Sequence, residues 1–284
     1  MTNNARGEPQ GRVLIVAGSD SGGGAGIQAD IKAVTMMGGF AMTAVTAVTV
    51  QNTLGVTGIH EIPPQIVRDQ MKAVLSDIGA DAVKTGMLHS VEIIEGAAAE
   101  IEAGAAEAAL VVDPVMIAKG GARLLAENAV DAMRQILIPM ATLLTPNVPE
   151  AEALTGREIR TLDGQKAAAD ALLGLGADAV LIKGGHLEGT IVTDVLATQE
   201  AMHTMTSPRI DTRHTHGTGC ALASAIAALL SQGVEMTLAV EAARDYVHEA
   251  IRTAPGFGQG HGPLNFLALP DEDDTPEMGS MLRH

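Results

Sequence analysis

The chain has 284 residues, 46% of them hydrophobic, and a formal net charge of -16 from 34 acidic and 18 basic residues. This composition supports a large buried core and leaves no basic stripe to neutralise phosphates, which argues against a nucleic-acid partner. The single cysteine rules out an intrachain disulfide, and the apolar runs are too short to span a bilayer. Residues 1–11 lack the apolar centre of a signal sequence, so we expect a cytoplasmic protein.

The first part of the chain predicts alternating strands and helices. The apolar run 12–17 predicts a strand buried on both faces, and it leads through the glycine-rich loop 18–26 into a helix over 27–37. This loop is not a Walker A motif and fits the dinucleotide fingerprint poorly, because Ile27 stands at the last glycine position. Further strands are expected at 40–50, 82–85, 109–113, 142–145 and 178–183, and further helices at 63–76, 90–103, 122–136, 149–154 and 162–173.

The pattern changes after this alternation. Short runs at 190–197 and 201–206 predict an antiparallel edge, and two helices follow at 220–231 and 236–251. The whole pattern predicts an α/β fold with a doubly wound, mostly parallel sheet and helices on both faces. We expect one domain over residues 12–268, between a disordered N-terminal tail (1–11) and an acidic C-terminal tail (269–284).

A short turn before the 220–231 helix predicts an anion site. Gly217 and Gly219 permit close backbone approach, and the first helical amides, with the helix dipole, favour a phosphate oxygen. Cys220 falls in the first turn, where this field favours thiolate over thiol. Two alternatives stay open: an ordinary helix start with a buried cysteine, and a metal site made by His214, His216 and Cys220, which no CxxC or HxxxH spacing supports.

Polar residues follow most of the predicted strands, at the edge where open α/β sheets bind ligands. Asp113 and Glu150 offer hard oxygen ligands for Mg²⁺, and Lys183 can meet a nucleotide phosphate. Gln51 and Asp30 can read a small polar heterocycle through donor and acceptor groups. Each residue alone also fits a cap, a turn or a solvated helix position. Together they predict phosphoryl transfer from a magnesium nucleotide to a small hydroxyl compound.

Seven blocks of residues resemble a known family from about residue 12 to 268. They are similar to the hydroxymethylpyrimidine/phosphomethylpyrimidine kinases of thiamine biosynthesis, a branch of the ribokinase-like superfamily. The blocks are Ala17-Gly-Ser-Asp-Ser-Gly-Gly-Gly-Ala-Gly-Ile-Gln-Ala-Asp30, Gln51-Asn-Thr53, Lys84-Thr-Gly-Met87, Asp113-Pro-Val-Met116, Thr145-Pro-Asn-Val-Pro-Glu150, Lys183-Gly-Gly-His186 and His216-Gly-Thr-Gly-Cys220.

The resemblance implies a reaction and its residues. It implies two ATP-dependent phosphorylations, of 4-amino-5-hydroxymethyl-2-methylpyrimidine and then of its monophosphate, by a homodimer that uses Mg²⁺. Cys220 is then catalytic, within the turn of Gly217 and Gly219, and Asp113 and Glu150 serve the metal. The other residues implied are Lys183, Asn147 and Thr218 for the nucleotide, and Gln51, Gly18, Asp30, Met87 and Val115 for the pyrimidine.

Three other functions remain as alternatives. A pyridoxine or pyridoxal kinase shares the Gly-Thr-Gly-Cys pattern, although Gln51 and Met87 favour the pyrimidine. A domain that senses the pyrimidine without turnover would not need Cys220, Asp113 or Lys183. A nicotinamide-dependent oxidoreductase is disfavoured by the poor dinucleotide fingerprint. The segment 118–121 is either a mobile flap over the site or an ordinary surface loop.

Overall fold

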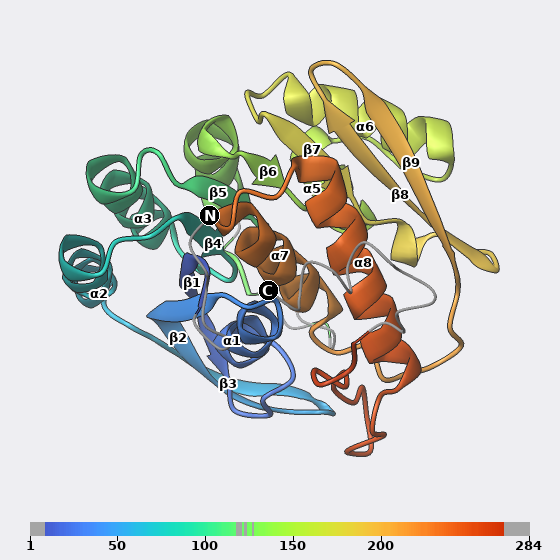
Figure 1. Cartoon of the computed structure of the whole chain (residues 1–284), viewed down its shortest axis with the longest axis horizontal. Coiled ribbons are helices and arrows are strands. Elements are labelled where there is room, and N and C mark those ends of the chain that lie inside the picture. The colour runs from blue at the N-terminus through green and yellow to red at the C-terminus, as the bar shows by residue number, and fades with distance from the viewer. Residues whose placement is uncertain (1–8, 118–120, 122–123, 127, 270–284) are drawn as a thin grey trace, which may run out of the picture.

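The computed structural model describes residues 9–117, 121, 124–126 and 128–269, and within them one nine-stranded sheet lies between two layers of helices (Figure 1). The strands are β1 (Arg12–Asp20), β2 (Phe40–Asn52), β3 (Gly55–Glu61), β4 (Ala82–Thr85), β5 (Ala109–Val112), β6 (Leu143–Leu144), β7 (Ala179–Ile182), β8 (Ile191–Thr198) and β9 (Met202–Pro208). The helices are α1 (Gly26–Met36), α2 (Pro64–Asp77), α3 (Val91–Gly104), α4 (Ala129–Ala132), α5 (Val148–Thr155), α6 (Leu162–Leu173), α7 (Thr218–Ser231) and α8 (Met236–Arg252).

The strand order confirms the predicted doubly wound, mostly parallel sheet. The order is β3-β2-β1-β4-β5-β6-β7-β8-β9, and the pairs from β2 to β7 are parallel. The expected antiparallel edge is present as β8 and β9. Because β1 lies between β2 and β4, the chain winds in both directions from β1. A ligand crevice is expected beyond the carboxyl ends of the strands at this point.

The opposite edge of the sheet corrects the prediction of strict alternation. β3 follows β2 directly and pairs with it in antiparallel register, so a hairpin stands where no strand was expected. Gly55 and Gly58 weaken the strand pattern of this segment, and its residues are at best half-buried. An edge strand of this kind has no apolar face in its sequence, which explains why the pattern missed it.

Two hydrophobic clusters fill the two sides of the sheet. One joins the strands to α2, α3, α5 and α6, and the other joins them to α1, α7 and α8 (Figure 1). The alanine-rich helix α7 buries every residue from Ala221 to Leu229. Small side chains let α7 approach the sheet closely, and this brings its N-terminus to the strand ends.

The helix predicted over 122–136 is shorter than expected. α4 begins at Ala129 and continues as a π-turn (Met133–Leu137) and a 3-10 turn (Ile138–Met140). The amides of Leu124 and Leu125 donate to the carbonyl of Met116, and Ala126 donates to His89, so these amides are not available to a helix. Residues 118–120 of the possible flap lie outside the described residues, as do most of the two predicted tails.

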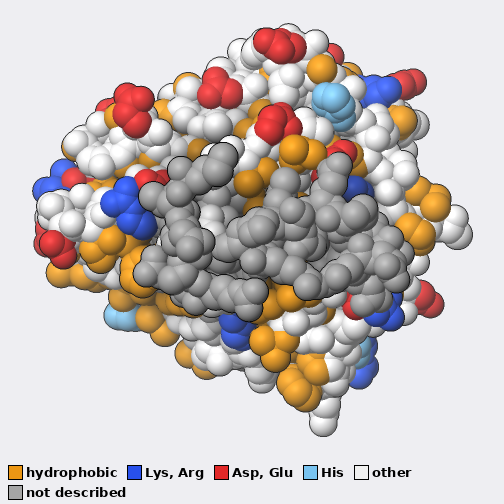
Figure 2. Space-filling view, in the orientation of Figure 1, with side chains coloured by type: hydrophobic (Ala, Val, Ile, Leu, Met, Phe, Trp, Pro, Cys, Tyr) orange, Lys and Arg blue, Asp and Glu red, His pale blue; other side chains and the backbone are white. Residues whose placement is uncertain are grey.

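The charged side chains are scattered over the face of the molecule shown in Figure 2. On the face shown in Figure 2, acidic side chains are dispersed among apolar and uncharged ones, and basic side chains stand apart from one another. In the described part of the chain, no helix has the length and apolar character needed to cross a membrane.

Candidate functional site

Two glycine-rich loops from distant parts of the chain meet beside β1. Gly217 has a φ of 84°, and a Cβ atom there would lie 1.7 Å from the carbonyl oxygen of Gly24. A Cβ on Gly24 would in turn lie 2.5 Å from Cδ2 of His216. The turn before α7 therefore packs directly against the loop after β1, and neither Gly217 nor Gly24 has room for a side chain of its own.

The N-terminus of α7 faces the strand ends, as the sequence predicts. Gly217 is its N-cap, and no side chain caps the first amides. The Thr218 hydroxyl donates to the carbonyl of Thr215 at 2.7 Å, which shapes the turn. A Cβ on Gly219 would lie 3.1 Å from Nζ of Lys183, so the lysine reaches this turn. Amides and an ammonium group thus converge where an anion would bind.

Lys183 forms an ion pair with Asp113 beside this turn. Its Nζ lies 3.0 Å from Oδ1 of Asp113, and the side chains are 14% and 3% exposed. Burial opposes the charge on Lys183, but Asp113 and Glu150 outweigh it and raise its pKa above the ordinary value. The Lys183 ammonium group therefore stays charged and can bind a phosphate.

Asn147 and Glu150 form a capping box at the start of α5. The Glu150 amide donates to Oδ1 of Asn147 at 2.9 Å, and the Asn147 amide donates to Oε2 of Glu150 at 2.8 Å. Burial, with a contribution from Asp113, raises the pKa of Glu150 to about 7, although Lys183 opposes the rise. Two carboxyl groups near one lysine fit a magnesium ion that takes one or two protein oxygens and completes its shell with water and phosphate.

Cys220 corrects one prediction from the sequence. Burial raises the pKa of its thiol to about 12, and the positive charge of Lys84 only partly opposes this. The expected thiolate is therefore wrong for this state, because desolvation exceeds the effect of the helix terminus. The described residues contain no cluster of three or more His, Cys, Asp or Glu side chains that could hold a metal, which removes the His214, His216 and Cys220 alternative.

Asp30 also differs from its expected place. Its side chain has no exposed surface; Oδ1 accepts from Nζ of Lys84 at 2.9 Å and from the Ser224 hydroxyl at 2.7 Å. Asp30 is thus neither a solvated helix residue nor a residue that lines an open pocket. It lies in the protein interior, between α1, β4 and α7.

Three of the other expected pocket residues lie together. A Cβ on Gly18 would lie 3.1 Å from Sδ of Met87, so the backbone of β1 and this thioether are neighbours. Met87 packs with Ala47 and Leu124 in a small apolar cluster that also contacts Val115. These residues form an apolar wall at the strand ends.

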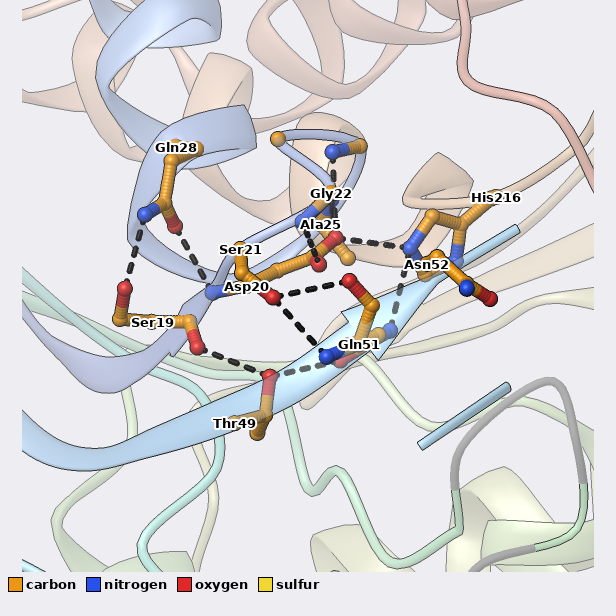
Figure 3. Close-up of polar contacts among 12 residues, drawn as sticks. Ser19, Asp20, Ser21, Gly22, Ala25, Gln28, Thr49, Gln51, Asn52 and His216 are labelled. Carbon is orange, nitrogen blue, oxygen red and sulfur yellow. Dashed lines mark hydrogen bonds and ion pairs between the residues drawn. The ribbon is translucent and has the colours of Figure 1, made fainter. Parts of the chain in front are cut away.

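Gln51 stands at the end of β2 within a polar network (Figure 3). Its carboxamide contacts Thr49 at 3.0 Å and Nε2 of His216 at 3.2 Å. His216 in turn contacts Oδ2 of Asp20 at 2.8 Å. Sequence reasoning gave Asp20 and His216 no role at the substrate. Two signals were available: Asp20 ends a buried strand and His216 precedes the glycine turn, and both residues lie in the blocks that resemble the kinase family.

A separate hollow of about 570 Å³ lies between α6 and β8. Arg160, Gln165, Glu188 and Thr193 are among its lining residues. Neither Asp113 and Glu150 nor Lys183 and Cys220 line it, so we place the candidate site at the strand ends.

Comparison with known proteins finds relatives over most of the chain. The family described as phosphomethylpyrimidine kinase matches residues 20–265. The hydroxymethylpyrimidine/phosphomethylpyrimidine kinase of Bacillus subtilis (strain 168) is 48% identical over 259 residues, covering 91% of this chain and 95% of that protein. The thiamine biosynthesis bifunctional protein ThiED of Geobacter sulfurreducens is 50% identical over 264 residues, covering 93% of this chain and 54% of that protein. This chain therefore spans about half the length of the bifunctional relative.

A solved structure shows the same fold. The ADP complex of Bacillus subtilis pyridoxal kinase is 37% identical, with a TM-score of 0.83, and the match covers 90% of this chain and 97% of that one. The chain has the ribokinase-like fold of these kinases, and the match over residues 20–265 establishes that it belongs to the phosphomethylpyrimidine kinase family.

Proposed function

We propose that the chain transfers a phosphoryl group from ATP to the hydroxyl of 4-amino-5-hydroxymethyl-2-methylpyrimidine, and then a second one to the monophosphate. The observation that carries the proposal is the contact of the α7 turn with Lys183 and Asp113, because the loop of Asp113 also carries Val115 of the apolar wall. Relatives 48% identical over nearly their whole length bear the name of this activity.

The residues divide the work between nucleotide and pyrimidine. Lys183, the amides around Gly219 and the polar groups of Thr218 and Asn147 serve the phosphates, because they offer positive charge and donors at one place. Asp113 and Glu150 would hold Mg²⁺, which when bound neutralises charge on the transferred phosphoryl group.

The pyrimidine lies between Gln51 and the apolar wall. Gln51 supplies a hydrogen-bonding amide, while Gly18, Met87 and Val115 supply an apolar surface for the ring. Cys220, in the first turn of α7, contacts the substrate hydroxyl as a neutral thiol. Asp30 supports this site from the interior and makes no contact with the ring.

Pyridoxal phosphorylation is the second candidate, supported by the likeness to a pyridoxal kinase at a TM-score of 0.83. The Lys183–Asp113 pair and the α7 turn serve either substrate, so only the ring-binding groups discriminate. A sensing domain without turnover is less well supported, because a phosphate site next to the ring site has no use in it.

We also propose a cytoplasmic homodimer with one kinase domain over residues 12–268. Val48 and Val50 are 44% and 63% exposed, and alternate residues of a strand share a face. Leu54, in the β2–β3 turn, is 68% exposed. A second copy of the chain would cover this apolar edge, and Val50→Lys should then convert a dimer to a monomer in light scattering. A wild-type monomer would refute this part of the proposal.

The deciding assay offers magnesium-ATP with the pyrimidine and with pyridoxal in parallel, and identifies the products by mass. Pyrimidine monophosphate followed by diphosphate supports the proposal, whereas preferential pyridoxal phosphorylation replaces it with the second candidate. Cys220→Ala should lower turnover about tenfold or more, because the neutral thiol positions the substrate hydroxyl without taking its proton, and near-normal turnover would remove Cys220 from the reaction.

A further inference from the structure

The protonation of His216 follows from its neighbours. The Asp20 carboxylate is 3% exposed and accepts from the backbone amides of Gly22 at 2.7 Å, Gly24 at 3.1 Å and Ala25 at 2.8 Å. A carboxylate with these donors is ionised and only accepts hydrogen bonds. The 2.8 Å contact between Oδ2 of Asp20 and Nε2 of His216 therefore requires a proton on Nε2.

The hydroxyl of Thr49 has a single proton, and its neighbours decide where that proton goes. Its Oγ1 lies 3.0 Å from the carbonyl oxygen of Ser19, which can only accept. The hydroxyl proton is directed to Ser19. Toward Gln51, also 3.0 Å away, Thr49 then offers only a lone pair.

These two proton positions fix the Gln51 carboxamide. In Figure 3 the amide nitrogen lies 3.2 Å from Nε2 of His216 and the amide oxygen 3.0 Å from Oγ1 of Thr49. With Nε2 of His216 protonated, the nitrogen cannot remain at this contact, because both atoms would donate. The amide oxygen cannot face Thr49, because both atoms would accept. The two ends of an amide have nearly the same shape, so the hydrogen-bond network decides between them. The consistent arrangement reverses the amide, so that Nε2 donates to Thr49 and Oε1 shares the single Nε2 proton of His216 with Asp20.

We propose that Asp20 and His216 are positioning residues that hold the Gln51 carboxamide in this one orientation and thereby set substrate specificity. The inference rests on the proposed function, in which Gln51 contacts the pyrimidine. One N–H group and one oxygen lone pair of the Gln51 carboxamide remain free to bind the pyrimidine ring. Because the amide cannot turn over, the donor and the acceptor keep fixed positions. A ring edge with the complementary order of acceptor and donor is bound, and one with the reverse order is not.

Burial makes this arrangement persistent. His216 is 8% exposed, Asp20 3% and Thr49 4%, so water cannot readily replace any of the three contacts. The imidazole also fills the space above Gly24, where a Cβ would lie 2.5 Å from Cδ2. The ring of His216 therefore has little freedom to turn and present another atom to Gln51.

A double-mutant cycle tests whether Asp20 acts through Gln51. We expect Asp20→Asn to raise the KM for the pyrimidine about tenfold, the effect of losing one ordered hydrogen bond, and to leave the KM for ATP within about twofold. In a Gln51→Ala background, Asp20→Asn should add less than about twofold. Additive effects would overturn the proposal, since they would show that Asp20 acts on the substrate by another route.

Gln28→Ala is the matched control. Gln28 accepts from the Asp20 amide at 2.9 Å and donates to the Ser19 hydroxyl at 2.8 Å, so it holds the same loop without a contact to His216. We expect its KM for the pyrimidine to stay within about twofold of wild type. A rise as large as that of Asp20→Asn would mean that only loop shape matters. If Asp20→Asn does not fold, His216→Gln, which keeps a donor, should bind the pyrimidine more tightly than His216→Leu.

Nitrogen-15 NMR of histidine-labelled wild-type protein gives a readout independent of activity. The His216 signal is identified by its loss in His216→Gln, and its Nε2 should carry a proton with or without substrate. An unprotonated Nε2 would overturn the inference. A protonated Nε2 in a protein that does not phosphorylate the pyrimidine would overturn the proposed function and leave the geometry of Asp20, His216 and Gln51 intact.

Discussion

Lys84 donates to Asp30 across 2.9 Å, and neither side chain has any exposed surface. The Ser224 hydroxyl, one helical turn after Cys220, donates to the same oxygen of Asp30. Burial is the largest single effect on the pKa of Lys84 and lowers this pKa. The negative charges of Asp30, Cys220 and Asp113 together outweigh burial, so the pKa of Lys84 is above its ordinary value. The Lys84–Asp30 ion pair therefore lies beneath the candidate site and is fully enclosed by protein.

Removal of Lys84 should lower the stability of the folded protein. We expect Lys84→Met to lower the free energy of unfolding by about 3–5 kcal/mol, because it leaves the Asp30 carboxyl buried without a cation. Urea unfolding measures the loss. The double variant Lys84→Met/Asp30→Leu should recover most of it, and a double variant as unstable as the single one would contradict this explanation.

The protonated state of Cys220 can be tested directly because it is the single cysteine in the chain. With a pKa of about 12, the thiol stays protonated at neutral pH and becomes more ionised with every rise in pH. We expect the rate of iodoacetamide modification of the native protein to rise about tenfold per pH unit from pH 7 to 10. A rate that levels off near pH 7 would show a thiolate at the helix terminus instead.

The sequence predicted the shape of the turn before α7 but not the protonation state of Cys220. Gly217 and Gly219 identify the turn, because helix starts that bind anions have local sequence requirements. The pKa of Cys220 depends on its burial and on charges from segments far away in the chain, such as Lys84 in β4, which opposes the rise, and Asp30 in α1, which adds to it. Local residues therefore predict the shape of a site better than its protonation.

Glu150 should make folding stability depend on pH. Burial raises its pKa from 4.5 to about 7, so the folded state binds this proton more tightly than the unfolded state. The resulting stabilisation is complete below about pH 4.5 and is lost as the pH rises to about 7. In magnesium-free buffer, wild type should lose on the order of 3 kcal/mol relative to Glu150→Gln across this range.

Gln at this position suits the comparison, since it can still complete the capping box with Asn147. Urea unfolding of both proteins between pH 4.5 and 7.5 supplies the measurement. A stability difference that does not change with pH would show that Glu150 ionises normally in the fold.

Gly219 leaves room for the ammonium group of Lys183. The Cβ of an alanine would lie 3.1 Å from Nζ and 3.8 Å from Oδ2 of Asp113, so Lys183 must shift. We expect Gly219→Ala to lower kcat/KM for ATP at least about tenfold, because small displacements of a positioning group are costly. Gly164→Ala, in the first turn of α6 with its nearest contact at 3.5 Å, is the control. Equal effects of the two changes on steady-state kinetics would refute the role of this contact.

The sequence predicted the fold better than it predicted the contacts that hold the site residues in place. Buried strands such as β1 and β7 are continuous apolar runs, and the polar residues at the ends of β7 and β2 identify Lys183 and Gln51. The contact of Asp20 with His216 joins residues 196 positions apart, and no periodicity connects them. The sequence placed Asp30 in the substrate pocket for the same reason. Its partner Lys84 belongs to β4, and no local pattern shows that the two side chains meet in the interior.

The direct packing of Gly217 against the carbonyl of Gly24 also bears on synthesis and folding. The loop after β1 leaves the ribosome early, but the backbone that completes it arrives only with the last quarter of the chain. A nascent chain that ends before α7 can form the parallel strands and still lacks the turn that packs against Gly24. The candidate site of this protein is therefore completed late, when the turn at Gly217 packs against the loop at Gly24.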